Sequence, residues 1–559
     1  MEGVSAKTET LFWADKIAHE AIEEAKRRNL RVVVCRSGQT PSGAKHIGNF
    51  NDNIRSYFVA KCVENAGFKS RHVQTHDDMD PLRKIPERVQ DLEGKWHTLS
   101  AREIERMEKY VGFPLISVPD PFGCCKNWAL HFETLWEDGC RKVGIEKTEY
   151  YRNEDLYRSG KFNPFIKTVF ERIETVRSIL LEHKTTKTAD YIPFWVICEN
   201  CGRLTGRVID FDTESKTVTY VCSERMLAGK YKIPGCGHKS SVSWENGTGK
   251  LDWQLEWPAQ MVMFNTVVEP FGKDHYEGSW PICREVLPKV YNYKGIIPFV
   301  YEFFLIDGKK MSTRHGNVYV MQDMLEIMEP EVFCFLYTKR PAKQREISLR
   351  DMKLIDDFEH AERVYFGIEK AKNEHEEMNL KQQYELAWCD RRVPERKPLR
   401  ISYSVAAMVV QLIRDPERVD SALKLLEKIG HIKLPLSDEE KEQVKTRLKL
   451  AKRWVERFAP ENVRFSVLPT LPEEVIEKLS EKQRGALREV AERMKSREYT
   501  AEELHAELYS IAKSHGLTSR EFFSAAYRIL IGRDHGPRLA PFLLSLDREF
   551  VIKRFSLKG

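Results

Sequence analysis

The hydrophobic positions of the N-terminal part follow two alternating patterns. Apolar residues recur about every 3.6 positions over residues 9–29, which predicts an amphipathic helix. The apolar run 32–35 predicts a buried strand, the mixed segment 51–66 a helix, and residues 71–75 a second strand. This alternation is typical of a Rossmann-type parallel sheet, whose ligand crevice lies beyond the carboxyl ends of its strands.

The pattern changes after about residue 330, where helical periods continue without strand alternation. Residues 351–372 predict a charged amphipathic helix, and the proline-rich, charged stretch 391–398 predicts a linker. The remainder predicts a bundle of at least five helices. They are expected at 421–429, 444–458, 473–494, 501–514 and 519–531.

The loop between the first strand and the first following helix, residues 36–50, has the composition of a phosphate-binding turn. Gly38 and Gly43 allow close backbone approach, and the backbone N–H groups at the next helix start favour an anion. His46 adds a donor, and Gly48, without a Cβ, would let a flat base lie against the backbone. Most glycine-rich turns bind no nucleotide, so this stretch needs a partner motif.

A basic loop far downstream, residues 306–317, is the candidate partner. Its paired lysines, Ser312 and Arg314 lie on a Gly-flanked loop, which suits a mobile arm that neutralises a triphosphate. A solvated basic loop is the ordinary alternative. The acidic residues Asp77, Asp78 and Asp80, just after the second predicted strand, face either the crevice or solvent.

Composition narrows the class of protein. The chain has 559 residues, of which 42% are hydrophobic and 31% charged, so several globular domains are expected. The net charge is +6, and residues 401–559 hold 29 Lys and Arg against 24 Asp and Glu, a balance of +5 that is compatible with a polyanionic partner. Residues 1–20 show no signal peptide, and the longest uncharged stretch, 401–413, is too short to span a membrane. We therefore expect a cytoplasmic protein.

The cysteines are clustered, which favours metal over disulfides in a chain without a secretion signal. Four potential tetrahedral zinc ligands lie within twelve residues, although adjacent cysteines can also be packing residues. These four are Asp120, Cys124, Cys125 and His131.

The second cysteine cluster predicts a structural zinc ribbon. Cys198 and Cys201 form a C-x-x-C-G knuckle, and Cys222 and Cys236 follow a hairpin-like stretch at 208–220. His238 competes with Cys236 as the fourth ligand. We favour Cys236, because four thiolates make the more usual closed site.

Several motifs together carry a resemblance to a known family. His46-Ile47-Gly48-Asn49 and Lys310-Met311-Ser312 resemble the two signature motifs of class I aminoacyl-tRNA synthetases. With Pro41-Ser42-Gly43, the Trp253 to Pro258 segment, Glu269 to His275 and Gly532 to Leu539, the chain resembles the archaeal-type class I lysyl-tRNA synthetases. The match is strongest over residues 1–340.

The resemblance implies roles for particular residues. His46, Asn49, Lys310 and Ser312 would be catalytic. The ATP site would comprise Ser42, His46, Gly48, Asn49, Lys310, Met311 and Ser312. The lysine pocket would comprise Gly38, Thr40, Trp253, Glu256, His275 and Tyr301. The first cysteine cluster also matches the family's first zinc site. Two departures are Thr313-Arg314-His315 after the second motif and Glu256 in place of an expected aspartate.

The implied fold is α/β: a Rossmann-type parallel-sheet catalytic domain with a zinc-binding insertion, then an all-α anticodon-binding domain. The expected boundaries are 1–118 and 251–325 for the catalytic halves, 119–250 for the insertion, 326–398 for a helical stem and 399–559 for the anticodon-binding domain. The implied activity is ATP-dependent ligation of L-lysine to tRNA(Lys) through lysyl-adenylate. ATP with Mg²⁺ and structural Zn²⁺ are the implied cofactors, and a monomer without membrane contact is expected.

The residue types of the predicted pocket give a separate physical argument for lysine as the substrate. A buried ammonium needs a carboxylate, neutral acceptors and an apolar wall for its methylene stem, and Glu256, Tyr301 and Trp253 supply that chemistry. An arginine pocket would also be acidic, so only the motif context favours lysine. Two rival functions are a small-molecule nucleotidyltransferase, for which the helical region would be surplus, and a non-catalytic RNA-binding protein.

Overall fold

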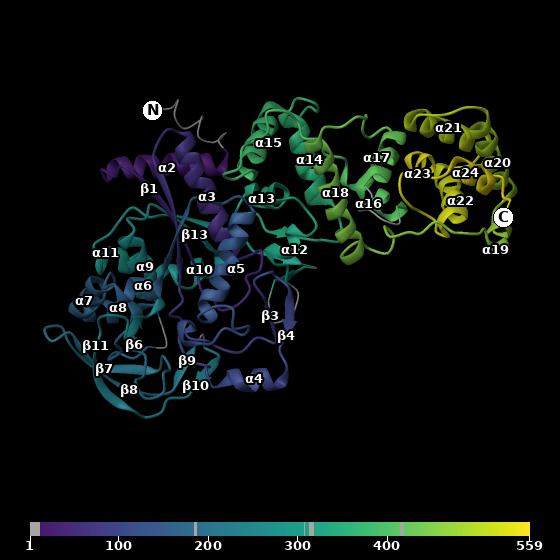
Figure 1. Ribbon diagram of the computed structural model, residues 1–559. Helices are drawn as coiled ribbons and strands as arrows, with labels where there is room; N and C mark the ends of the chain where they lie inside the picture. The colour runs from purple at the N-terminus through teal and green to yellow at the C-terminus, as the bar shows by residue number, and fades with distance from the viewer. Residues whose placement is uncertain are drawn as a thin grey trace. The chain divides into compact units, whose positions relative to one another are not determined.

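The computed structural model describes residues 12–183, 187–227, 229–306, 308–311, 318–413 and 419–558. The chain divides into two compact units (Figure 1). The first contains Met1–Gln322, Phe333–Ile347 and Asn373–Arg392, and the second contains Asp323–Val332, Ser348–Lys372 and Val393–Gly559. The chain therefore crosses between the units several times, and the five-part division expected from the sequence stays a prediction.

A five-stranded sheet forms the centre of the first unit, and all its neighbouring strands are parallel. In spatial order its strands are β14 (Ile297–Tyr301), β13 (Val268–Gly272), β1 (Val33–Gln39), β2 (Ser70–His76) and β5 (Thr148–Arg152). The chain runs outward from β1 to β5, then returns to the other side of β1 with β13. This order confirms the Rossmann-type sheet, and its switch point lies between β1 and β13.

Helices surround this sheet as the apolar periods predict. The expected helix 9–29 is α2 (Trp13–Arg27), and the expected helix 51–66 is α3 (Phe50–Asn65), which packs on β1 and is buried on most of its surface. The other helices up to residue 387, except α14, which belongs to the second unit, follow in chain order. They are α4 (Ala101–Glu108), α5 (Trp128–Lys142), α6 (Asn153–Arg158), α7 (Asn163–Glu171), α8 (Ile173–Glu182), α9 (Trp253–Met263), α10 (Lys273–Glu277), α11 (Trp280–Lys289), α12 (Met321–Leu325), α13 (Pro330–Thr338) and α15 (Glu374–Ala387), with a 3₁₀ turn at Leu115–Ser117.

A separate antiparallel sheet is inserted between β5 and β13. Its spatial order is β11 (Lys239–Ser243), β8 (Thr217–Cys222), β7 (Gly206–Asp212), β6 (Phe194–Val196) and β12 (Gly249–Leu251), with a hairpin of β9 (Arg225–Leu227) and β10 (Tyr231–Ile233) beside it. The hairpin expected at 208–220 is the β7–β8 pair. The expected insertion 119–250 also contains β5, which belongs to the parallel sheet.

Two small sheets complete the first unit. One pairs β3 (Arg88–Gln90) with β4 (Trp96–Thr98). The other joins β15 (Phe304–Ile306) to β16 (Lys309–Lys310) and to β17 (Arg345–Glu346). The second of these carries the basic loop that the sequence pairs with the phosphate-binding turn.

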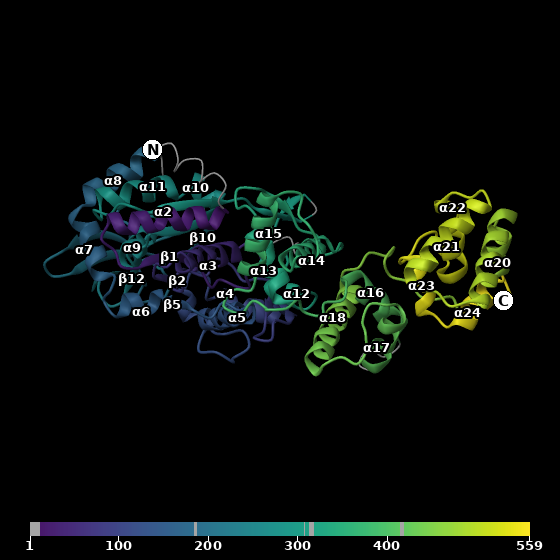
Figure 2. The same ribbon diagram turned by 90° about the horizontal axis from the view of Figure 1, so that it is seen from above.

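The described part of the second unit contains helices and no strand, as Figure 2 also shows. Its core includes the ring contact of Tyr403 on α16 with Trp454 on α18, 6.0 Å between centroids. Besides the parts of α12 and α13 that it shares, its helices follow in chain order. They are α14 (Lys353–Tyr365), α16 (Tyr403–Leu412), α17 (Val419–Lys428), α18 (Asp438–Arg457), α19 (Glu473–Glu477), α20 (Glu481–Ser496), α21 (Ala501–Ser514), α22 (Ser519–Ile531), α23 (Leu539–Ser545) and α24 (Arg548–Phe555).

Three helix predictions need correction. The helix expected to end at 372 ends at Tyr365, because Gly367 adopts a φ of +71° that terminates it. The helix expected at 473–494 is two helices, because Ser480 begins α20 with a capping box. The helix expected to start at 444 starts at Asp438, where Ser437 forms another capping box.

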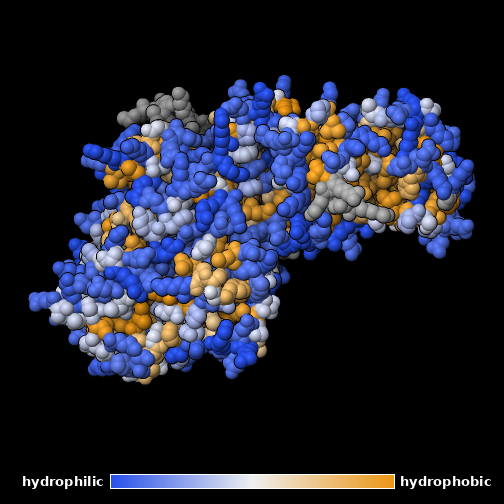
Figure 3. All heavy atoms as spheres, in the orientation of Figure 1, coloured by the Kyte–Doolittle hydropathy of each residue, from blue (hydrophilic) through white to orange (hydrophobic). Residues whose placement is uncertain are grey.

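No helix among the described residues is both long enough and apolar enough to cross a membrane. The face drawn in Figure 3 is mostly hydrophilic, with apolar patches scattered across it. The apolar side chains gather instead inside each unit, and one large cluster among the described residues joins the inserted sheet to β1 and β2 of the parallel sheet.

Candidate active site and metal clusters

The loop after β1 is fixed by contacts at His46 and at the next residue, Ile47. Ile47 donates its N–H to the carbonyl of Tyr319 (2.8 Å), and the Tyr337 hydroxyl donates to the carbonyl of Ile47 (2.8 Å). His46 and Val320 also form an isolated β-bridge. The signature loop is therefore held in one conformation by residues that lie far downstream in the sequence.

The His46 side chain is partly buried and prepared to act as a neutral donor or acceptor. Burial, together with the nearby charges of Lys45 and Lys310, lowers the pKa of His46 to about 4. The Nδ1 atom of His46 is buried and has no hydrogen-bond partner within the described structure. A buried ring nitrogen without a partner is costly, so this atom suits contact with a ligand.

Gly48 is the point at which the two signature motifs meet. A Cβ built on Gly48 would lie 2.8 Å from the imidazole of His46 and 3.4 Å from the terminal methyl of Met311. Any side chain here would displace the His46 ring, which explains the glycine. The other two ATP-site predictions in this loop lie nearby: Asn49 directly precedes α3, and Ser42 lies 3.4 Å from Lys45 Nζ.

The basic loop brings Lys310 to the carboxyl ends of β13 and β14. Lys310 lies on β16, its Nζ is 3.5 Å from a carboxylate oxygen of Asp274 and 3.4 Å from the ring centroid of Phe303. Its side chain is half-exposed, so it is free to move to another anion. The predicted site residue Ser312, like Thr313-Arg314-His315, lies outside the described residues.

Four of the six residues predicted for the lysine pocket come from the carboxyl ends of neighbouring strands or just after them. Gly38 is on β1 and Thr40 follows it, Tyr301 ends β14, and His275 is in α10, directly after β13. Trp253 on α9 lies 6.0 Å from the His275 ring, centroid to centroid. The Tyr301 hydroxyl donates to Asp52 at 2.7 Å. These residues place aromatic rings next to polar groups beyond the carboxyl ends of β1, β13 and β14.

Glu256, the sixth predicted pocket residue, is fully buried and already paired. It accepts a hydrogen bond from the Tyr157 hydroxyl (2.8 Å) and lies 2.7 Å from Lys250 Nζ. Lys250 also binds Asp80, which in turn accepts a hydrogen bond from Thr40 at 3.3 Å. The Glu256 carboxylate is therefore connected to the crevice through Lys250, Asp80 and Thr40.

Burial and charge compete inside this chain of contacts. Burial raises the pKa of Glu256 to about 7, against the opposing effect of Lys250. Burial alone would lower the pKa of Lys250, but Asp80 and Glu256 outweigh it and hold the pKa above its usual value. Lys250 thus stays charged.

A buried polar network behind β1 has no counterpart among the sequence predictions. Arg36 is fully buried and donates to Thr75 Oγ1 (2.7 Å), Glu269 and Gln260. Gln260 donates onward to Asp77 at 3.0 Å. Asp77 and Asp78 are both buried, so the solvated-loop alternative for them is wrong. The signal for this network in the sequence was an arginine directly after the apolar run 32–35.

The first candidate metal cluster joins the loop before α5 to that helix. One ligand atom from each of Asp120, Cys124, Cys125 and His131 lies within 4.8 Å of the others. His131 Nδ1 is 3.0 Å from an Asp120 oxygen and 3.4 Å from Cys124 Sγ, while its Nε2 lies 2.9 Å from the carbonyl of Gln90. Metal-binding histidines are commonly oriented by such a bond on the other nitrogen.

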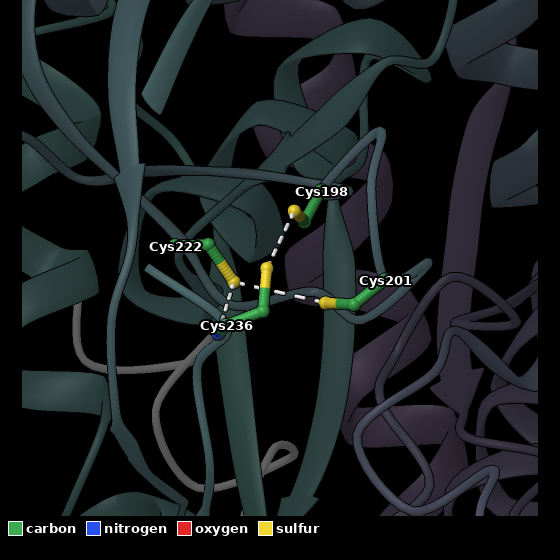
Figure 4. A group of neighbouring side chains, drawn as sticks. All are labelled: Cys198, Cys201, Cys222 and Cys236. Carbon is green, nitrogen blue, oxygen red and sulfur yellow. Dashed lines mark hydrogen bonds between the residues drawn. The ribbon is translucent and has the colours of Figure 1, made fainter. Parts of the chain in front are cut away.

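The second cluster brings together the four sulfurs of Cys198, Cys201, Cys222 and Cys236 (Figure 4). All four lie within 4.8 Å of one another, with Cys198 to Cys236 and Cys201 to Cys222 each 3.7 Å apart. Among the described residues His238 is not part of this group; its carbonyl accepts a hydrogen bond from the N–H of Cys222. Four converging sulfurs are the usual donor set of a closed zinc site.

Comparisons with known proteins cover most of the chain. A family model described as tRNA synthetases class I (K) matches residues 11–389, and one described as an anticodon binding domain matches residues 417–557. A lysine–tRNA ligase of Haloarcula marismortui is 35% identical over 97% of this chain and 96% of its own. One of Pyrococcus horikoshii is 36% identical over 98% of this chain and 100% of its own.

Among solved structures, the crystal structure of a glutamate tRNA ligase from Elizabethkingia meningosepticum covers 94% of this chain and 99% of its own. Its TM-score is 0.40 at 13% sequence identity, a likeness that supports no argument by itself. The family models and the two full-length relatives are the informative similarities.

Proposed function

This chain belongs to the class I tRNA synthetases of the lysine type, and on that premise we propose which of its residues perform the ligation of L-lysine to tRNA(Lys). The enzyme uses ATP with Mg²⁺. The lysine carboxylate attacks the α-phosphorus of ATP, which forms lysyl-adenylate and releases pyrophosphate. The terminal hydroxyl of the tRNA then attacks the lysyl carbonyl and releases AMP.

The meeting of the two motifs at Gly48 is the observation that carries this assignment. A Cβ on Gly48 would lie 2.8 Å from His46 and 3.4 Å from Met311, so the two motifs come together at this residue and are placed to contact the same nucleotide. The low pKa of His46 makes it a neutral hydrogen-bonding partner for a phosphate oxygen. Lys310 supplies the positive charge as pyrophosphate departs.

The remaining ATP contacts are proposals of the same kind. Ser42 and the backbone N–H groups at the start of α3 are suited to phosphate, because helix N-termini favour anions. Asn49 lies at that helix start with its side chain not engaged in capping. Ser312 follows Met311 in the second motif and would complete the set.

For the lysine pocket, we assign the aromatic side chains to the methylene stem and the polar groups to the charged ends. Trp253, His275 and Tyr301 provide the wall, and Gly38 and Thr40 provide close backbone and hydroxyl contact. Glu256 acts from behind Thr40 through Lys250 and Asp80. Glu256 and Asp80 share the cation Lys250, so the group of three carries a net negative charge behind the pocket when both carboxyls are ionised.

Zinc at both cysteine clusters is a structural proposal. Each cluster offers four protein donors, so no position remains for a reactive water. Elemental analysis of protein purified without added metal tests this proposal. Two equivalents of zinc per chain would support both sites, one equivalent would contradict one of them, and no zinc would contradict both.

A charging assay with all amino acids tests the proposed function. Wild-type protein should attach lysine to tRNA(Lys) and no other amino acid at a comparable rate. A small-molecule nucleotidyltransferase would instead exchange pyrophosphate without charging any tRNA, and a non-catalytic RNA-binding protein would do neither. We also propose that the enzyme is a cytoplasmic monomer, which sedimentation analysis and cell fractionation would check.

A further inference from the structure

The C-terminal helices have a group of aromatic side chains at their surface, outside the hydrophobic core. Within the described part of 419–558, Tyr509 on α21 is the one exposed large hydrophobic side chain, at 44%. Its ring lies 4.8 Å from the His505 ring and 5.2 Å from that of Phe523 on α22, centroid to centroid. Phe523 in turn contacts Phe522, which is fully buried, at 5.5 Å. We call His505, Tyr509 and Phe523 the Tyr509 platform.

The Tyr509 platform is anchored on one side and open on the other. Phe522 ties it to the core, while His505 is exposed and the Tyr509 hydroxyl has no hydrogen-bond partner among the described residues. Aromatic rings held in this way present contact area at little cost in conformational entropy. Such surfaces bind flat, apolar faces by stacking.

Two cations flank the platform without a counter-ion. Lys513 lies one turn after Tyr509 on α21, and Arg520 lies one turn before Phe523 on α22; both are exposed, and neither has an ion-pair partner within the described residues. Three of the nearby carboxylates are engaged elsewhere and do not cancel this charge. Glu503 and Glu521 cap α21 and α22, and Glu507 pairs with Arg493 and Arg497.

We propose that the Tyr509 platform stacks an unpaired base of the anticodon loop of tRNA, while Lys513 and Arg520 contact the adjoining phosphates. Single-stranded RNA offers splayed bases beside backbone phosphates, which is the combination of rings and cations found here. The surface lies within residues 417–557, which match an anticodon binding domain. The inference rests on the proposed function, because it takes tRNA as the substrate.

The full-length enzyme tests this inference with three variants and one control. Tyr509→Ala should weaken binding of tRNA(Lys) about tenfold or more, because a stacked base is lost, while Tyr509→Phe keeps the ring and should bind within about twofold of wild type. A Lys513→Gln/Arg520→Gln double variant should flatten the dependence of log K on log salt by about 0.7 for each charge removed. Lys495→Gln removes a cation that is paired with Glu492, and should leave the slope unchanged.

A hairpin of the anticodon stem and loop identifies the contacted part of the RNA. Replacing its loop bases one at a time with abasic nucleotides should cost wild type about tenfold at one position, and Tyr509→Ala nothing further at that position. Equal losses in both proteins, or tRNA binding by Tyr509→Ala equal to wild type, would overturn the inference. Weaker tRNA binding without any effect on the hairpin would place the contact outside the anticodon loop and overturn it too.

The failure of this inference can be told apart from the failure of the proposed function. Wild-type enzyme that charges no tRNA with lysine contradicts the function itself. Wild-type enzyme that charges tRNA(Lys) while Tyr509→Ala does so with an unchanged KM contradicts the platform alone. Circular dichroism of each variant confirms that α21 is intact before binding is compared.

Discussion

The ammonium of Lys250 lies 2.7 Å from the carboxylate of Glu256 in the interior of the first unit, where none of Glu256 is exposed. The pair joins β12, the last strand of the inserted sheet, to helix α9. The sequence suggests that Glu256 binds the ammonium of the substrate lysine, but in the structure this carboxylate is already paired with Lys250 of the protein.

Lys250→Met should destabilise the protein, because it leaves Glu256 and Asp80 buried without their cation. Breaking a buried ion pair costs about 3–5 kcal/mol. The loss should be larger at pH 8 than at pH 6, since the Glu256 carboxylate can take up a proton at the lower pH. Thermal unfolding at both values measures it, and Lys216→Met, which removes an exposed partner of Glu245, should change little.

Glu256→Gln should raise the KM for lysine by about tenfold and leave the KM for ATP within about threefold, because it removes a charge behind the lysine pocket and not at the ATP site. The variant also frees Lys250 to bind Asp80 alone, which alters the group that Thr40 contacts. Steady-state charging kinetics measure both constants. An unchanged lysine KM would mean that another carboxylate, such as Asp274, reads the amine.

Lys310→Ala should lower kcat for charging by two to three powers of ten, about 3–4 kcal/mol, with little change in lysine affinity. The reason is that the loop cation acts on charge that develops as pyrophosphate leaves. Lys309→Ala is the matched comparison, because Lys309 precedes it on β16 and points to the opposite face. Equal losses in the two variants would argue for a general effect of the loop.

Single cysteine substitutions should remove the two metal ions independently. Cys124→Ala should leave one equivalent of zinc, Cys222→Ala should leave the other, and the double variant should hold none, because the two donor sets share no residue. Cys283→Ala, which changes a buried cysteine outside both clusters, should retain two equivalents. Elemental analysis of each purified variant distinguishes these outcomes.

His72 should make the folded protein sensitive to acid. Its two ring nitrogens are each 2.8 Å from a hydroxyl, those of Ser56 and Thr148, and burial lowers its pKa to about 3. The unfolded chain takes up this proton first as the pH falls, so the stabilisation present above about 6.5 is lost between 6.5 and 3. The pH dependence of the unfolding temperature should be flatter in His72→Gln, and parallel curves would contradict this role.

Local signals in the sequence were enough for much of the fold. The apolar period alone gives the helix 501–514 at the bounds that α21 has, and the alternation of patterns gives the parallel sheet. The start of α18 was also readable, because Ser437 and Glu440 have the spacing of a capping box seven residues before the apolar period begins at Val444. The break at Ser480 has the same explanation.

The surroundings of the predicted site residues could not be derived in this way. The partners of Arg36 come from three separate elements, at Thr75, Gln260 and Glu269, and only the folded sheet brings them together. Likewise the sequence suggests a carboxylate at Glu256, but its pairing with Lys250 depends on the position of β12. A sequence motif identifies a candidate site residue, but the charge state of that residue depends on the neighbours that the fold places around it.

The position of β13 next to β1 has a consequence for synthesis on the ribosome. Their pairing joins Cys35 to Val268, so the central contact of the sheet closes only after the whole insertion has been made. Pairing between strands far apart in the sequence is slow, because the entropy cost of closing a large loop comes before any stabilising contact forms. During synthesis β1, β2 and β5 are therefore made before β13 and β14 exist, and the five-stranded sheet can close only after Tyr301 has left the exit tunnel.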